Sequence, residues 1–155
     1  MRYILSKFTQ YIEQRAWNNA AHNNLEHFYA STVDIEHILP QTPNDNVMDS
    51  FDKPEKYEEY VEKLGNLTLL EKTINTSVSN DLYVNKKAGY RQSSFLLTRS
   101  IAEKPQVGSN TQLNRAVRDL LQFEEWSSES IELRQEMLVK LASEVWGMPS
   151  AEDNS

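Results

Sequence analysis

Apolar residues recur at every third or fourth position along much of the chain, which is the spacing of one face of an α-helix. The pattern predicts an amphipathic helix over residues 2–17 and a shorter helical piece over 23–29. A last helix is expected to begin at a serine cap, Ser127 or Ser128, and to end before Gly147. Four more helices are predicted between these, over residues 54–64, 73–82, 85–102 and 113–123.

Two stretches have the composition of short strands instead. Over residues 33–39, β-branched and apolar residues alternate with acids, and Pro40 ends the pattern. Residues 66–70 form a second apolar run after Gly65, so the two stretches can pair as a short antiparallel ribbon. Loops rich in Pro, Asn, Asp, Ser or Gly are predicted over residues 42–53 and 105–110.

Length and composition indicate one domain. The chain has 155 residues, enough for one hydrophobic core, and no cysteine, which excludes disulfides and thiolate zinc sites. It has no apolar run of membrane-spanning length and no secretory signal, which predicts an intracellular protein. We expect a mainly helical α+β fold in a single domain over residues 1–149. Its expected parts are a helical N-terminal extension (1–30), a core that contains the ribbon (33–82), a helical subdomain (83–149) and a disordered tail (150–155).

The net charge of -7 argues against bulk electrostatic attraction to nucleic acid. The charge is unevenly distributed, because residues 82–118 contain seven basic residues and one acidic residue. Lys86, Lys87 and Arg91 in this stretch are candidates for contacts with a nucleic-acid backbone. The alternative is a solvated helix face, which the same pattern also fits.

Residues 34–41, DIEHILPQ, place two carboxylates and a histidine within four positions. Successive side chains of a regular strand point to opposite faces, so Glu36 and His37 serve one cleft only if the strand bends or ends there. The nearby Pro40 favours such a break. The helix predicted after the second strand would carry Asn75 in its first turn, against the ribbon. Its amide oxygen is a hard ligand that suits Mg²⁺ or Mn²⁺.

Taken together, DIEHILPQ, GNLTLL at residues 65–70 and Asn75 resemble the His-Asn-His (HNH) nuclease pattern of the ββα-metal, or His-Me finger, superfamily. In particular, the sequence resembles the C-terminal HNH-like domain of GmrSD-type restriction enzymes, which implies that the fold is built around a ββα-metal (HNH) core over residues 33–82. Either half of the motif alone would be a weak signal, whereas the combination is specific. The likeness runs from about residue 33 to 147 and includes Asn80, Lys86, Lys87, Tyr90, Ser93, Trp126, Ile131, Arg134 and Trp146.

The resemblance implies that His37 is the general base that activates water, and that Asn66 fixes the loop that orients His37. It also implies that Glu36 and Asn75 bind a divalent metal, Mg²⁺ or Mn²⁺, with Asp34 as an alternative acidic ligand. An imidazole titrates close to neutral pH, which agrees with the role of a base. The structural alternatives are a buried, hydrogen-bonded His37 and a turn role for Asn66.

The function expected from this resemblance is that of a metal-dependent DNA endonuclease or nickase domain. It would be the effector part of a prokaryotic restriction or anti-phage defence protein, located in the cytoplasm, with modified phage DNA as a substrate and an NTPase domain or subunit as a partner. The main alternative is an inactive HNH-derived module that binds DNA or docks on the NTPase. A purely structural helical domain is a third hypothesis.

Overall fold

The computed structural model describes residues 1–18, 20–105 and 111–149. The predicted tail and most of the predicted 105–110 loop lie outside these residues. The helices and strands are α1 (Arg2–Trp17), β1 (Val33–His37), α2 (Asp45–Ser50), α3 (Tyr57–Val61), β2 (Leu67–Glu71), α4 (Lys72–Val78), α5 (Tyr83–Gln92), α6 (Leu96–Ala102), α7 (Thr111–Val117) and α8 (Ser128–Trp146). The short 3-10 helices are η1 (Ala20–Asn23), η2 (Leu25–Phe28), η3 (Pro54–Lys56) and η4 (Leu64–Asn66).

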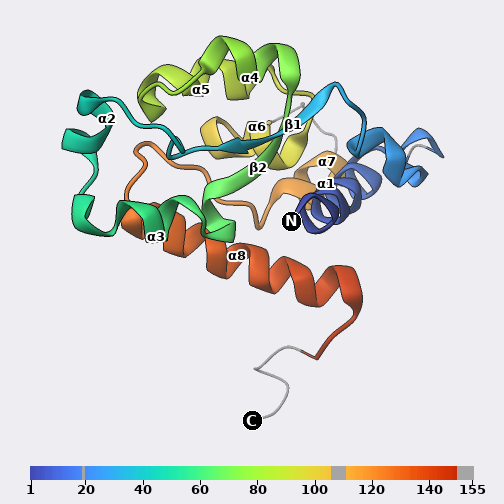
Figure 1. Cartoon of the computed structure of the whole chain (residues 1–155). Coiled ribbons are helices and arrows are strands. Elements are labelled where there is room, and N and C mark those ends of the chain that lie inside the picture. The colour runs from blue at the N-terminus through green and yellow to red at the C-terminus, as the bar shows by residue number, and fades with distance from the viewer. Residues whose placement is uncertain (19, 106–110, 150–155) are drawn as a thin grey trace.

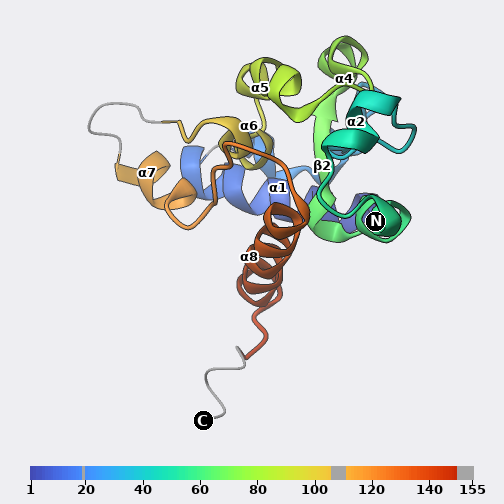
Figure 2. The same cartoon turned by 90° about the vertical axis from the view of Figure 1, so that its left-hand side faces the viewer.

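The two strands pair as an antiparallel ribbon, with His37 opposite Leu67 and Val33 opposite Glu71. The α4 helix follows β2 without a break and packs against both strands. In Figures 1 and 2, α4 and α5 lie on one side of the ribbon and α8 lies on the other. The predicted mainly helical α+β class with a two-stranded antiparallel ribbon is therefore confirmed. The single domain over 1–149 stays a prediction.

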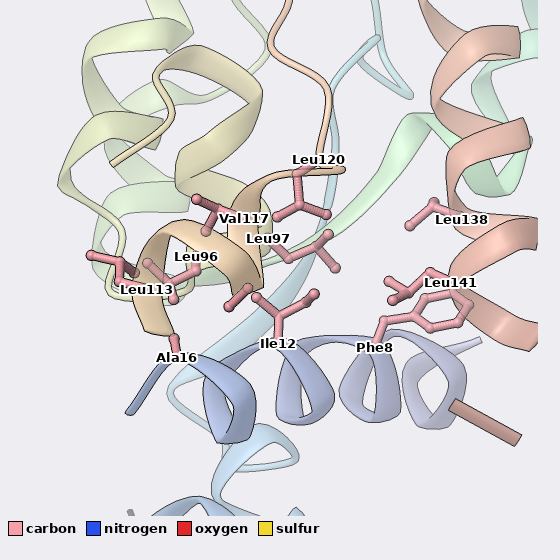
Figure 3. Packing of buried hydrophobic residues seen from close by; sticks show 11 residues of the cluster. Phe8, Ile12, Ala16, Leu96, Leu97, Leu113, Val117, Leu120, Leu138 and Leu141 are labelled. Carbon is pink, nitrogen blue, oxygen red and sulfur yellow. The ribbon is translucent and has the colours of Figure 1, made fainter. Parts of the chain in front are cut away.

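The largest apolar cluster is helical and lies beside the ribbon. Phe8 and Ile12 of α1 pack against Leu97 of α6 and against Leu138 and Leu141 of α8, with α7 closing one end (Figure 3). The α1 helix thus contributes Phe8, Ile12 and Ala16 directly to this cluster. Among the described residues, no helix combines the length and the apolar character needed to cross a membrane.

The last helix has the caps that its sequence predicts. The Ser127 hydroxyl accepts a hydrogen bond from the Ser130 backbone N–H, and the Ser130 hydroxyl accepts one from the Ser127 N–H, which makes a capping box. Gly147 ends α8 in the left-handed conformation, with φ of 62°. Asn18 ends α1 in the same conformation, which asparagine tolerates better than most residues.

Two sequence predictions are wrong for identifiable reasons. The predicted 42–53 loop contains α2, because the Asn44 side chain caps the Val47 N–H and starts a helix. The predicted 85–102 helix is two helices. The carboxylate of Glu71 accepts hydrogen bonds from the Ser93 hydroxyl and from the N–H and hydroxyl of Ser94, and this contact holds the chain outside helical geometry between α5 and α6.

Most other elements are shorter than predicted. The first strand ends at His37 and not at residue 39, and the helix expected over 73–82 ends at Val78. Ser79 follows it with a positive φ of 47°. The expected 54–64 helix is divided into η3, α3 and η4, and the helix expected over 113–123 ends at Val117.

Candidate functional site

A polar pocket of about 320 Å³ lies where β1 ends, beside the second half of α4 and the residues that follow this helix. It brings Glu36, His37 and Asn75 together, which are three of the residues singled out by the motif. Because β1 ends at His37, the neighbouring side chains of Glu36 and His37 both line this one pocket. The condition required by the sequence, that the strand stop at this point, is therefore met. The remaining lining residues are Ile35, Gln41, Thr76, Ser79 and Asn80.

Glu36 is largely buried, and its carboxylate accepts hydrogen bonds from two side chains. Its Oε1 atom accepts a hydrogen bond of 2.6 Å from Lys86 Nζ and one of 2.7 Å from the Tyr90 hydroxyl. Glu36 is 5% exposed and Lys86 is 1% exposed, so the ion pair is sheltered from water. Within the described part of the chain, Glu36 Oε2 accepts no hydrogen bond. That oxygen is the one left for a further ligand.

His37 is half-buried on the pocket wall. Burial lowers the pKa of its imidazole, and the nearby carboxylates of Glu62 and Glu36 oppose this shift only in part. A lowered pKa keeps the ring neutral at neutral pH, which is the form that can accept a proton. No residue in the described ranges makes a hydrogen bond to either ring nitrogen, so both remain available to water or substrate.

Asn66 is fully buried and holds the segment that follows His37. Its side chain accepts a hydrogen bond of 2.7 Å from the Leu39 N–H and donates one of 3.0 Å to the Leu39 carbonyl. It also donates to the Val61 carbonyl and accepts from the indole N–H of Trp126, both at 3.0 Å. These four bonds make Asn66 a clamp on the loop next to His37.

Asp34 and Asn75 contact each other. Asn75 Nδ2 donates a hydrogen bond of 3.1 Å to Asp34 Oδ2, which ties the first turns of α4 to β1. Asp34 does not line the pocket, whereas Asn75 does. The amide oxygen of Asn75 accepts no hydrogen bond from the rest of the described chain and is thus available to a ligand.

The side-chain oxygens of this site are of the kind that a hard divalent cation binds. Such a cation would take most of its ligands from water and substrate. Glu36 and Asn75 both line the pocket, and each has one side-chain oxygen without a hydrogen bond among the described residues, while Asp34 is hydrogen-bonded to Asn75. Within residues 1–18, 20–105 and 111–149, no group of three His, Cys, Asp or Glu side chains forms a cage for a metal ion. Such a partial set suits Mg²⁺, which usually retains waters and takes substrate phosphate oxygens beside one or two protein ligands.

The three basic residues predicted to touch a nucleic-acid backbone lie in different surroundings. Lys86 points inward, and at 1% exposure it has no access to a phosphate, so that interpretation is corrected for Lys86. Lys87 forms an ion pair with Glu124, at 3.1 Å. Arg91, whose side chain is 46% exposed, forms one with Glu103, at 3.3 Å. The excess of basic residues in this stretch is thus partly compensated within the fold.

Lys86 and Tyr90 have a role around Glu36 that the sequence interpretation missed. Both belong to α5, and their spacing of four residues places them on one face of that helix. Both were also among the positions that matched the family pattern beyond its core motif. The four-residue spacing of Lys86 and Tyr90, together with the acid at position 36, was the sequence signal from which this contact could have been predicted.

Taken together, the fold is a mainly helical α+β domain with an acid, a histidine and an amide on one pocket at the end of its ribbon. The family model for the C-terminal domain of GmrSD restriction endonucleases matches residues 1–141. The chain therefore belongs to this family, and the resemblance noted from the motif is confirmed. Membership implies nuclease activity, with DNA as the substrate. Comparison with curated proteins and with solved structures found no match to the chain.

Proposed function

We propose that this chain is a metal-dependent DNA endonuclease domain of the HNH type, with His37 as the general base. The observation that carries the proposal is the convergence of Glu36, His37 and Asn75 on one pocket, although Asn75 lies on a different element from the other two. The strand–strand–helix order of β1, β2 and α4 supports it, because this is the order that the ββα-metal resemblance implies.

In the proposed reaction His37 removes a proton from a water molecule in the pocket, and the resulting hydroxide attacks the phosphorus of a phosphodiester. The bond from phosphorus to one ester oxygen breaks, and that oxygen leaves and takes a proton from solvent water. The lowered pKa of His37 supplies a neutral imidazole for this step at neutral pH. Glu36, through Oε2, and Asn75, through its amide oxygen, would hold Mg²⁺ or Mn²⁺. Asp34 orients Asn75 or replaces Glu36 as the acidic ligand. When bound, the metal ion supplies positive charge that stabilises the developing negative charge on the phosphate and leaving oxygens.

The first proposed contacts with the DNA backbone are made by uncharged side chains that line the pocket. Gln41, Thr76 and Asn80 offer hydroxyl and amide donors beside His37. Lys87 and Arg91 remain proposed contacts, because both pair with exposed acids. The Arg91–Glu103 pair is exposed on both sides, and such surface pairs are worth only about 0–1 kcal/mol, so a phosphate can replace Glu103 at small cost. Lys87 is largely buried, and only its partner Glu124 is exposed.

The finer biological setting rests on the family resemblance. We propose a restriction or anti-phage role in the prokaryotic cytoplasm, directed at modified phage DNA and exercised with an NTPase domain or subunit of a larger protein. A single site of this kind cuts one strand, so nicking is the expected elementary event.

One observation favours a second candidate function. The ion pair between Lys86 and Glu36 already neutralises the acid that would bind the metal. In an inactive HNH-derived module that only binds DNA, such a pair would permanently take the place of a metal ion.

The test is a nicking assay on supercoiled plasmid with Mg²⁺ or Mn²⁺, comparing the parent protein with His37→Ala. The matched control is His27→Ala, because His27 is an exposed histidine outside the pocket. We expect the parent and His27→Ala to nick equally, and His37→Ala to be slower by about 10²–10⁴-fold, the usual contribution of a general base. Undiminished nicking by His37→Ala would exclude His37 as the base, and no nicking by the parent with either metal would favour the inactive module.

A further inference from the structure

The ammonium group of Lys86 lies inside the protein and is surrounded by the residues of the candidate site. It donates hydrogen bonds of 2.6 Å to Glu36 Oε1, 3.0 Å to the His37 carbonyl and 3.3 Å to the Ile38 carbonyl. A lysine ammonium has three N–H donors. All three are therefore used within one short segment of the chain, residues 36–38.

Two side chains from different parts of the fold together hold the backbone around His37. Lys86 contacts the carbonyls of His37 and Ile38, and Asn66 contacts both the N–H and the carbonyl of Leu39. The Ile38 N–H also donates to the backbone carbonyl of Asn66, at 3.0 Å. The backbone N–H and carbonyl groups of residues 37–39 are thus held by hydrogen bonds from Lys86 and Asn66.

The same ammonium sets the orientation of the Glu36 carboxylate. Lys86 and Tyr90 both donate to Oε1, so the carboxylate is turned with one oxygen engaged and Oε2 left for the pocket. An ion pair this deeply buried adds little net stability relative to well-packed apolar residues, because desolvation of the charges offsets their attraction. Orientation is what the pair contributes.

We propose that Lys86 is a positioning residue of the nuclease site, which fixes the backbone of His37 and turns Oε2 of Glu36 toward the pocket. The inference rests on the proposed function and deepens it. It contradicts the simpler view that a lysine of this basic stretch contacts a DNA phosphate. The neighbouring residues of α5 show the contrast, since Lys87 and Arg91 pair with exposed acids at the surface.

The two roles predict different kinetics for Lys86→Met, measured by steady-state nicking of plasmid at saturating Mn²⁺. If Lys86 positions His37, kcat falls by about a hundredfold, the effect that a misplacement of ~1 Å can have on a catalytic group. KM and the salt dependence of KM then stay at the parent values. A lost phosphate contact instead raises KM and makes its salt dependence less steep, and that result would overturn the proposal. So would an unchanged kcat.

The control is Lys140→Met, the same substitution at an exposed lysine of α8 outside the pocket, which is expected to match the parent. Thermal unfolding of each variant checks that the fold is retained. If Lys86→Met does not fold, Lys86→Arg keeps the charge but replaces the compact ammonium by a planar group that cannot make the same three converging bonds. The same fall in kcat at unchanged KM is then expected, and parent-like kcat in Lys86→Arg would count against the proposal.

A second measurement does not depend on activity. The NMR signals of the His37 imidazole, assigned by their loss in His37→Ala, are expected to shift in Lys86→Met and to stay in place in Lys140→Met. If the parent protein does not cut DNA, the proposed function fails while this spectrum still tests the positioning. Unmoved His37 signals in a folded Lys86→Met protein would refute it.

Discussion

Replacement of Asn66 by alanine would remove the clamp behind the candidate site. Asn66 is 0% exposed, and its side chain makes four hydrogen bonds, two with the Leu39 backbone, one with the Val61 carbonyl and one with the Trp126 indole. Alanine makes none of them. The buried Leu39 N–H would then have no acceptor, and the partly buried indole N–H of Trp126 would lose its acceptor.

The expected cost follows from these four bonds. A typical intramolecular hydrogen bond contributes about 1 kcal/mol net, so the variant should lose about 4 kcal/mol of the free energy of unfolding. That is a large part of the ~5–15 kcal/mol that stabilises an ordinary domain. Nicking should fall as well, because the segment after His37 is no longer held. The exposed Asn85, whose amide donates to Asp81, is the control position, and Asn85→Ala should change stability by no more than about 0.5 kcal/mol.

Urea unfolding followed by circular dichroism measures the loss, and a double-mutant cycle assigns it. Trp126→Phe removes the indole N–H that donates to Asn66 and keeps an aromatic ring in place. The coupling energy between Asn66→Ala and Trp126→Phe should be about 1 kcal/mol, since one bond links them. A total loss below about 1 kcal/mol for Asn66→Ala, or no coupling in the cycle, would refute the clamp.

Two further predictions concern the scaffold. Burial raises the pKa of Glu13 to about 7 from its ordinary value of 4.5, so the folded state holds a proton that the unfolded state releases. Stability should therefore fall by about 3 kcal/mol as pH rises from about 4.5 to about 7, and unfolding of Glu13→Gln should lack this slope. In Gly65→Ala the new Cβ would clash with the backbone carbonyl oxygen of Ile131. Urea unfolding should show a loss of about 3 kcal/mol, at the upper end of ordinary overpacking costs.

Each of these two predictions has a clear contrary outcome. If parent and Glu13→Gln show the same pH dependence between about 4.5 and 7, Glu13 does not carry the buried proton. An unchanged unfolding midpoint in Gly65→Ala would mean that η4 and α8 separate easily, and that the close approach of the two segments is not required.

The helices at the two ends of the chain could be predicted from local sequence because their signals are local. The apolar spacing of residues 2–17 and the Ser127 cap define α1 and the start of α8 without any long-range contact. The break between α5 and α6 could not be predicted in this way. It depends on Glu71, which is more than twenty positions away along the chain and reaches Ser93 and Ser94 only after the ribbon has formed.

For the candidate site, the sequence by itself determined the family and the candidate residues. The order of acid, histidine and amide in the motif selected Glu36, His37, Asn66 and Asn75 as candidates, and their roles stay predictions. These choices needed only residue types and their spacing, because local spacing decides which side chains a short strand and the helix after it can present.

Only the tertiary structure decided which charges meet. In the sequence Lys86 is one of several basic residues on a helix, whereas in the fold it lies fifty residues from its acidic partner along the chain and 2.6 Å from it in space. The physical reason is that the burial and pairing of a charge depend on every element packed around it. Local patterns specify the backbone and the face of each element, but not what another element brings against that face.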